Sequence, residues 1–152
     1  MNKIFGIGLP RTGTASLAEA LNNMRHPTSH HCILHDGTCE THIENDIVAH
    51  VDNGFYINYE TLLEQHPNAL FILTTRNLDD WTESISKLQS TLDHMPNVES
   101  YEKAVLESFK RAAKENQLLV LNIFEDSRSI YKLSEFVGVK SDHITFPHVL
   151  RH

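Results

Sequence analysis

Residues 3–16 read Lys-Ile-Phe-Gly-Ile-Gly-Leu-Pro-Arg-Thr-Gly-Thr-Ala-Ser, and this stretch decides the fold. Its beginning, residues 3–8, is a short apolar run that stops at Gly8-Leu9-Pro10, which is typical of a buried strand that ends in a turn. A helix is expected next, because apolar residues then repeat at helical spacing. These residues are Leu17, Ala20, Leu21 and Met24. The stretch therefore predicts a strand, a glycine-containing loop and a helix.

The same alternation continues along the chain. The apolar runs at 69–75 and 118–123 predict two more buried strands, whereas 28–56 shows no clear pattern beyond short strands. Amphipathic helices are expected over 59–65, from the caps Asn77 or Asp79 to about Leu92, over 99–116, and from 130 to a cap at Gly138. Strands that alternate with such helices predict an α/β fold with three layers, α/β/α, around a central parallel sheet.

Length and composition limit the class of protein. The chain has 152 residues, 40% of them hydrophobic, and a formal charge of -7, which suits one domain over 1–152 with a single core. The acidic balance disfavours binding to nucleic acid or to an anionic membrane. Because no apolar stretch approaches the roughly 18 residues that span a bilayer, we expect a soluble, cytoplasmic protein. Cys32 and Cys39 are then expected to be reduced thiols.

The loop between the first strand and its helix is suited to an anion. The first N–H groups of a helix have no partner within it, and the helix dipole adds partial positive charge there. Gly8 and Gly13 have the Walker A spacing, but Thr14 and Ala15 stand where that motif has Lys and Ser or Thr, which disfavours a kinase or NTPase. Arg11 instead supplies a planar fork for two oxygens of a phosphate or sulfate.

Residues 8–17, Gly-Leu-Pro-Arg-Thr-Gly-Thr-Ala-Ser-Leu, resemble the loop with which sulfotransferases that use 3'-phosphoadenosine 5'-phosphosulfate (PAPS) hold the 5'-phosphosulfate. The likeness is closest to the branch in which Arg replaces Lys. It implies a fold like that of the P-loop NTPases and a set of residues that bind PAPS. In the loop these are Pro10, Arg11, Thr12, Gly13, Thr14, Ala15 and Ser16.

A second segment, residues 71–84, resembles the family's strand-to-helix element that binds the 3'-phosphate. By this resemblance Arg76, at the strand end, and Ser84, eight residues later, bind that group. The position is also physically sensible, because open parallel sheets collect ligands at the carboxyl ends of their strands. Looser similarity occurs at Asp52 and in residues 118–122, 133–139 and 146–149.

The chain also departs from the family. An acidic segment, Phe124-Glu-Asp-Ser127, follows the last strand where relatives carry Gly-Trp or a basic, glycine-rich loop. This departure puts nucleotide contacts from that side in doubt. The chain is short as well, so an abbreviated acceptor pocket, or one completed by a second subunit in a homodimer, is expected.

In sulfuryl transfer, negative charge develops on the oxygen that bridges the sulfo group and the phosphate, and Arg11 and the loop N–H groups would stabilise it. A base takes the proton of the acceptor. No metal is required in principle. Four residues are candidates for the base or another acceptor-side role: His30, His31, His35 and Asp52. The resemblance favours His31 and Asp52, so we assign catalytic roles to Arg11, His31 and Asp52. The acceptor is expected to be a hydroxyl or amine of a small molecule or carbohydrate.

Three alternatives stay open. A cluster of His and Cys side chains could hold zinc, although its spacing lacks paired C-x-x-C motifs and a polar loop over the active site is preferred. Its members are His30, His31, Cys32, His35, Cys39 and His42. The chain could also be an inactive nucleotide-binding module of the same fold, or a small-molecule kinase with an altered loop. ATP binding with magnesium would separate the kinase from the other two.

Overall fold

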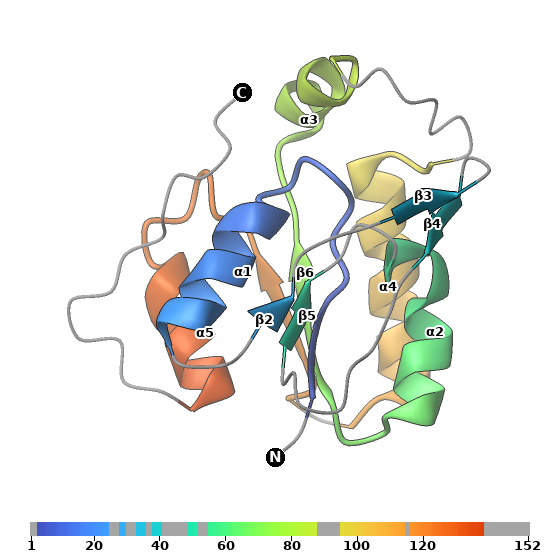
Figure 1. Ribbon diagram of the computed structural model, residues 1–152, viewed down its shortest axis with the longest axis vertical. Coiled ribbons are helices and arrows are strands. Elements are labelled where there is room, and N and C mark those ends of the chain that lie inside the picture. The colour runs from blue at the N-terminus through green and yellow to red at the C-terminus, as the bar shows by residue number, and fades with distance from the viewer. Residues whose placement is uncertain are drawn as a thin grey trace.

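The structure is a computed structural model that describes residues 3–24, 28–29, 33–35, 38–40, 49–51, 55–87, 95–114 and 116–138. Its centre is a sheet of five strands in which every pair is parallel (Figure 1). In spatial order the strands are β2 (Thr28–Ser29), β5 (Ala49–Val51), β1 (Ile4–Gly6), β6 (Leu70–Thr74) and β7 (Leu118–Leu121). A separate antiparallel pair is formed by β3 (Ile33–His35) and β4 (Thr38–Glu40).

Helices cover both faces of the sheet. Figure 1 shows α1 (Thr14–Asn23) and α5 (Ser129–Val137) on one face, with α2 (Phe55–Gln65) and α4 (Val98–Ala112) on the other. The short helix α3 (Leu78–Ile85) lies beyond the carboxyl end of β6. The three-layer α/β/α fold with a central parallel sheet is thus confirmed. None of the helices in the described ranges is long and apolar enough to cross a bilayer.

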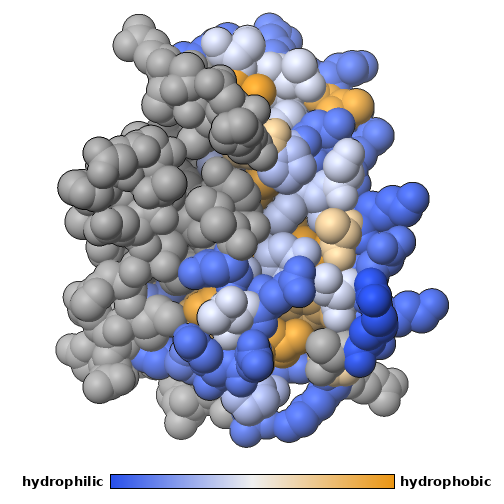
Figure 2. Space-filling view, turned by 90° about the vertical axis from the view of Figure 1, so that its right-hand side faces the viewer, coloured by the Kyte–Doolittle hydropathy of each residue, from blue (hydrophilic) through white to orange (hydrophobic). Residues whose placement is uncertain are grey.

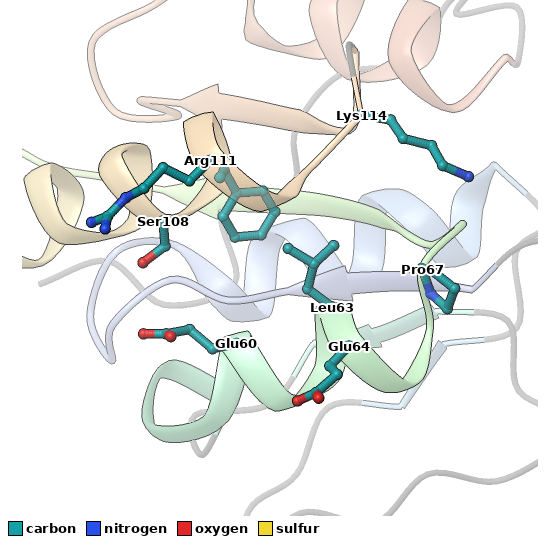
Figure 3. Close-up of a pocket in the computed structure, with 8 residues that line it drawn as sticks. Glu60, Leu63, Glu64, Pro67, Ser108, Arg111 and Lys114 are labelled. Carbon is teal, nitrogen blue, oxygen red and sulfur yellow. The ribbon is translucent and has the colours of Figure 1, made fainter.

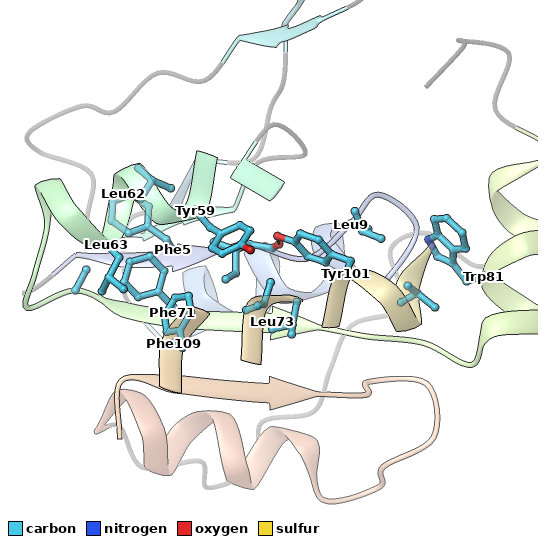
Figure 4. Close-up of a cluster of buried hydrophobic side chains, with 14 residues drawn as sticks. Phe5, Leu9, Tyr59, Leu62, Leu63, Phe71, Leu73, Trp81, Tyr101 and Phe109 are labelled. Carbon is cyan, nitrogen blue, oxygen red and sulfur yellow. Dashed lines mark hydrogen bonds between the residues drawn. The ribbon is translucent and has the colours of Figure 1, made fainter. Parts of the chain in front are cut away.

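The strands carry apolar residues on both faces because each face has its own core. Phe71 and Leu73 point to the side of α2 and α4, whereas Ile72 between them points to the side of α1 and α5. The larger cluster is rich in aromatic rings (Figure 4). Phe71 meets Phe5 at a tilt and Phe109 edge to face. The continuous apolar runs of the sequence follow from this double burial.

Several elements are shorter than the sequence pattern predicts. The helix expected over 99–116 ends at Ala112, because Ala113 is extended and Gln117 accepts the Lys114 N–H with its side chain. The strand expected to reach residue 123 ends at Leu121, where Asn122 begins a turn. For the helix expected to reach Leu92, the described part of α3 ends at Ile85, and residues 88–94 lie outside the described ranges.

The strand order creates a topological switch point between β1 and β6. The chain leaves β1 toward β2 and β5, and it leaves β6 toward β7 on the other side. The connections after two adjacent strands therefore diverge, and such a switch point is where open α/β sheets bind ligands. The loop 7–13 and Arg76 both lie at this point, because they directly follow β1 and β6.

Candidate active site

Side chains from elsewhere in the fold hold the backbone carbonyls of the loop between β1 and α1. The Tyr101 hydroxyl donates to the carbonyl of Ile7. The Trp81 Nε1–H donates to the carbonyl of Pro10 at 2.9 Å, and Arg76 Nη1 donates to the carbonyl of Arg11 at 3.2 Å. Because each bond joins the loop to a distant element, the loop conformation is fixed by the fold and not by the loop sequence alone.

Two residues of the loop have left-handed backbone conformations. Gly13 has φ 93° and is the N-cap of α1, and Arg11 has φ 69°, which is unfavourable for a residue with a side chain. The first hydrogen bond within the helix joins the Leu17 N–H to the Gly13 carbonyl at 3.0 Å. The backbone therefore turns sharply between the end of β1 and the start of α1.

The start of α1 differs from the starts of α3 and α4. Asn77 caps α3 with its side chain, Asn97 does the same for α4, and both of these helices have acidic residues in the first turn. Within α1, as the structure describes it, no side chain caps the first turn and none of its residues there is acidic. The positive end of the α1 dipole is thus not balanced by its own first turn, which suits an external anion.

Gly8 and Thr12 serve the packing between β1 and β6. The Thr12 hydroxyl lies 2.6 Å from both the Leu9 carbonyl and the Thr74 hydroxyl, and Thr12 is fully buried. A Cβ atom on Gly8 would lie 1.9 Å from Thr74 Oγ1, so no side chain fits there. Of the three hydroxyls in residues 10–16, that of Thr12 is therefore engaged inside the protein, so that Thr12 offers a ligand only its backbone.

Arg76 and Ser84 come from the segment that follows β6. The Arg76 guanidinium donates to the Arg11 carbonyl and lies over the ring of Phe124, with 4.1 Å from Cζ to the ring centroid. Ser84 is three residues after Trp81 on α3, so both side chains lie on the helix face that meets the loop. The structure thus places the two segments that the sequence singled out beside each other.

Two polar atoms of the site are buried and unsatisfied. Among the residues that the structure describes, neither Arg11 Nε nor Ser84 Oγ has a hydrogen-bond partner. A buried polar atom without a partner costs about 1–3 kcal/mol, so such atoms are rare and need a reason. A ligand with oxygen acceptors would satisfy both.

The remaining predicted residues divide into two groups. Thr14 and Ser16 are buried in the first turn of α1, and Ala15 between them is partly exposed. His31 and Asp52, like His30, lie outside the described residues, as do the side chains of the suggested zinc cluster. In the described part of the chain, no group of three or more His, Cys, Asp or Glu side chains is arranged to hold a metal ion.

The acidic side chains after β7 are paired with residues of the same turn and of α5. Asp126 forms an ion pair with Lys132, and its other carboxylate oxygen accepts the Arg128 backbone N–H at 2.9 Å. The hydrogen bond from Lys132, and next that from Arg128, hold the pKa of the Asp126 carboxyl below its usual value. Glu125 accepts a hydrogen bond from Asn122 at 3.3 Å. The negative charge that the sequence raised as an objection to a bound nucleotide is thus turned toward partners of its own turn and of α5.

Sequence reasoning missed three residues that hold the loop. Trp81 falls in the helix predicted from Asn77 or Asp79 to about Leu92, and a buried indole N–H normally requires an acceptor. Thr74 was included in an apolar strand, where a hydroxyl is itself a sign of an internal partner. Tyr101 falls in the helix predicted over 99–116, and a buried tyrosine hydroxyl likewise indicates an internal partner. Which carbonyl each donor would find depends on strand order, and local patterns do not contain that information.

A cavity lies away from this site. It has a volume of about 650 Å³ and lies between α2 and α4, near the amino ends of the strands (Figure 3). Its walls carry Glu60 and Glu64 on one side and Arg111 on the other, over a floor of Leu63 and Phe109. On the face shown in Figure 2, apolar residues appear as small separate spots among hydrophilic ones. This cavity shares no residue with the loop or with Arg76 and Ser84.

Comparison with known proteins supports the identification of the family. The family model described as "Sulfotransferase domain" matches residues 3–45 and 41–102. The fold is similar to that of a sulfotransferase from Alicyclobacillus acidocaldarius, with a TM-score of 0.61, 12% identity, and coverage of 100% of this chain and 86% of that chain. It is also similar to mouse sulfotransferase SULT7A1 complexed with PAP, with a TM-score of 0.56, 14% identity and coverage of 91% of this chain.

The chain spans only 59% of the length of the mouse protein. A search of curated proteins found no match. The matched region, residues 3–102, contains the loop, β6, Arg76 and Ser84, and it makes up well over half of the sequence. The chain therefore belongs to the sulfotransferase family.

Proposed function

We propose that this protein binds PAPS and transfers its sulfo group to a hydroxyl or amine of a small-molecule or carbohydrate acceptor. The proposal is supported by the family, by the loop at the switch point of the sheet, and by the likeness to a fold that was determined with PAP. PAP is the bisphosphate that remains after sulfo transfer. Arg11 and the N–H groups of residues 12–16 would hold the 5'-phosphosulfate, and Arg76 with Ser84 would hold the 3'-phosphate.

One observation carries the proposal: the hydrogen bond of 3.2 Å from Arg76 Nη1 to the Arg11 carbonyl. It brings the proposed 3'-phosphate site next to the loop that would hold the phosphosulfate, as a nucleotide with anions at both ends requires. An ordinary strand-to-helix turn has no need of a second arginine from the neighbouring strand.

The residues present fit such a ligand. Ser84 Oγ and Arg11 Nε are buried polar atoms without a partner in the described part of the chain, and each can donate to a phosphate or sulfate oxygen. An arginine and a hydroxyl at one site, and an arginine with a helix N-terminus at the other, match two separate anionic groups. Thr14 and Ala15, where a Walker A loop has Lys and Ser or Thr, disfavour the kinase alternative.

PAPS, when bound, supplies an activated sulfo group. In the transfer, the bond from sulfur to the bridging phosphate oxygen breaks, a bond from sulfur to the acceptor oxygen or nitrogen forms, and the acceptor proton passes to a base. Arg11 and the N–H groups at the start of α1 stabilise the negative charge that develops on the bridging oxygen. We propose His31 as the base and Asp52 as the residue that orients the acceptor or shares the proton.

Calorimetric titration tests the binding step. We expect PAP to bind in the presence of a metal chelator, and ATP with magnesium to bind much more weakly. Arg76→Ala should reduce the affinity for PAP by about 10- to 100-fold, because it removes charge-assisted hydrogen bonds worth about 1.5–3 kcal/mol. Arg111→Ala is the matched control, since this exposed arginine lines the cavity between α2 and α4.

Turnover tests the chemical step. Incubation with PAPS and a panel of phenols, alcohols, amines and sugars should release PAP only when an accepted substrate is present. PAP binding without any acceptor-dependent release across a broad panel would favour the inactive module. Tighter binding of ATP with magnesium than of PAP would instead overturn the sulfotransferase assignment in favour of a kinase.

A further inference from the structure

Phe124 has an unusual position for a large apolar residue. It follows β7 in the turn that contains the acidic segment, and 43% of its surface is exposed. Its ring nevertheless lies close to two parts of the site. The Arg76 guanidinium lies over the ring face at 4.1 Å, and a Cβ atom added to Gly13 would lie 3.5 Å from the Phe124 ring edge.

The contact with Arg76 is a cation–π interaction of good geometry, because the cation lies well within 6 Å of the ring centroid. A ring that contacts the face of a guanidinium does not occupy its N–H edge, and the edge is the part that binds phosphate oxygens. Phe124 and the Arg11 carbonyl thus hold Arg76 by two different features, its face and one N–H group.

An arginine side chain has many rotamers, and restricting it when a ligand binds costs conformational entropy. Contacts that restrict the side chain before binding remove part of this cost, so affinity rises without any new contact to the ligand. Core packing does not explain the exposed position of Phe124, since this residue belongs to neither buried cluster.

We propose that Phe124 is a positioning residue that orients Arg76 for the 3'-phosphate of the nucleotide. This inference rests on the proposed function, and it adds a residue that the loop and the segment after β6 do not contain. Because Phe124 acts through Arg76, its effect is confined to ligands that carry a 3'-phosphate.

The test compares two ligands on matched variants. Phe124→Leu keeps an apolar side chain but removes the ring, and Phe124→Tyr keeps the ring. Dissociation constants are measured by calorimetry for PAP and for adenosine 5'-monophosphate, which lacks the 3'-phosphate. We expect Phe124→Leu to weaken PAP binding by about two- to thirtyfold, and to leave the monophosphate within about twofold. Phe124→Tyr should restore the parent affinity for PAP.

Two further variants separate positioning from a general structural effect. In an Arg76→Ala background, Phe124→Leu should cause no additional loss of PAP affinity, because the ring then has no guanidinium to orient. Tyr131→Leu is the control: Tyr131 is 55% exposed on α5 and has its own arginine neighbour, Arg128 at 6.0 Å. This control should leave both ligands unaffected.

Three results would overturn the inference. Unchanged PAP affinity in Phe124→Leu would show that the ring does not orient Arg76. Equal losses for PAP and the monophosphate would show that the ring contacts the shared part of the nucleotide. Additive losses in the double variant would show independent roles. If the parent chain itself fails to bind PAP, the proposed function is wrong as well, whereas Arg76-dependent binding with no effect of Phe124 rejects only this role.

Discussion

Arg11 is the residue at which function and stability are in conflict. Its φ of 69° lies in the region that glycine adopts without strain, yet the position holds a large charged side chain. Left-handed backbone costs a residue with a Cβ about 1–2 kcal/mol. Strain of this kind persists where the surrounding structure imposes it, and it concentrates at functional sites. The hydrogen bonds of the Pro10 and Arg11 carbonyls to Trp81 and Arg76 impose it here.

A pair of substitutions at Arg11 separates strain from charge. Arg11→Gly and Arg11→Ala both remove the guanidinium, but only glycine relieves the backbone. We therefore expect Arg11→Gly to be more stable than Arg11→Ala by about 1 kcal/mol in urea unfolding, after allowance for the greater freedom of glycine in the unfolded chain. Equal stability of the two variants would show that the loop is not strained at this position.

Both Arg11 variants should be poor catalysts. Loss of the guanidinium should lower kcat by about 10²–10³, the effect of removing one donor to a developing oxyanion. Affinity for PAP should fall less, since the charge on the bridging oxygen grows toward the transition state. Steady-state kinetics and calorimetry on the same preparations provide the comparison. Equal losses in kcat and in PAP affinity would make Arg11 a simple anchor of the ground state.

At the scale of elements, β6 and α3 act as the support of the loop. Three side chains of this segment form hydrogen bonds with residues between β1 and α1. They belong to Thr74 at the end of β6, Arg76 after it, and Trp81 on α3. These three side chains hold the loop from outside it. Its geometry therefore depends on an element that lies far from it in sequence.

Trp81→Phe tests this support. The substitution keeps an aromatic ring in the core but leaves the Pro10 carbonyl without its donor. We expect a loss of about 1–3 kcal/mol in the free energy of unfolding, the cost of an unsatisfied buried acceptor. Amide hydrogen exchange should also quicken at residues 11–16 more than in β7. Uniform acceleration across all elements would mean that Trp81 stabilises the fold without any special link to the loop.

The stability of the turn between β7 and α5 is expected to depend on pH. The pKa of Asp126 is lowered in the folded protein, so its ion pair with Lys132 stabilises the turn above the unfolded pKa and is lost as the pH falls through the folded value. Carboxyl chemical shifts followed by NMR should show Asp126 titrating below the usual aspartate value of about 3.9. Lys132→Met should move that titration upward. An unmoved midpoint would exclude the pair as the cause.

At the scale of the molecule, the site depends on the order of the strands. The adjacency of β1 and β6 in the centre of the sheet places both proposed anion sites at one edge, and a core on each face keeps the sheet in place. Ligand binding should therefore stabilise the entire fold. PAP at about 100 times its dissociation constant adds about 2.7 kcal/mol, which corresponds to a rise in Tm of about 5–10 °C.

Differential scanning calorimetry with and without a chelator measures this shift. The shift should persist in the presence of the chelator, and Arg76→Ala should reduce it at the same concentration of PAP. Arg111→Ala, whose side chain lines the cavity at the other end of the strands, should retain the full shift. A Tm that does not respond to PAP would contradict a site built from the central strands.

The sequence predicts a feature of the fold or the site when the interactions that form it lie close together along the chain. The run Leu70–Thr74 was recognisable as a strand because double burial requires continuous apolar residues. The end of α4 was not, because Gln117, which donates to the carbonyls of Pro67 and Ala69, anchors the chain there through contacts distant in sequence. Arg76 and Ser84 could be predicted from their resemblance to a family segment. The role of Phe124 could not, because Arg76, which its ring contacts, follows a different strand, β6.

The bond between Trp81 and Pro10 has a practical consequence. Trp81 is the only tryptophan of the chain, and its indole is hydrogen-bonded to the loop proposed to hold the phosphosulfate. The protein thus contains a natural fluorophore at the one place where occupancy matters, with no second indole to obscure its emission. Its intensity and wavelength offer a label-free signal for nucleotide binding, fast enough to follow association and release in a stopped-flow instrument.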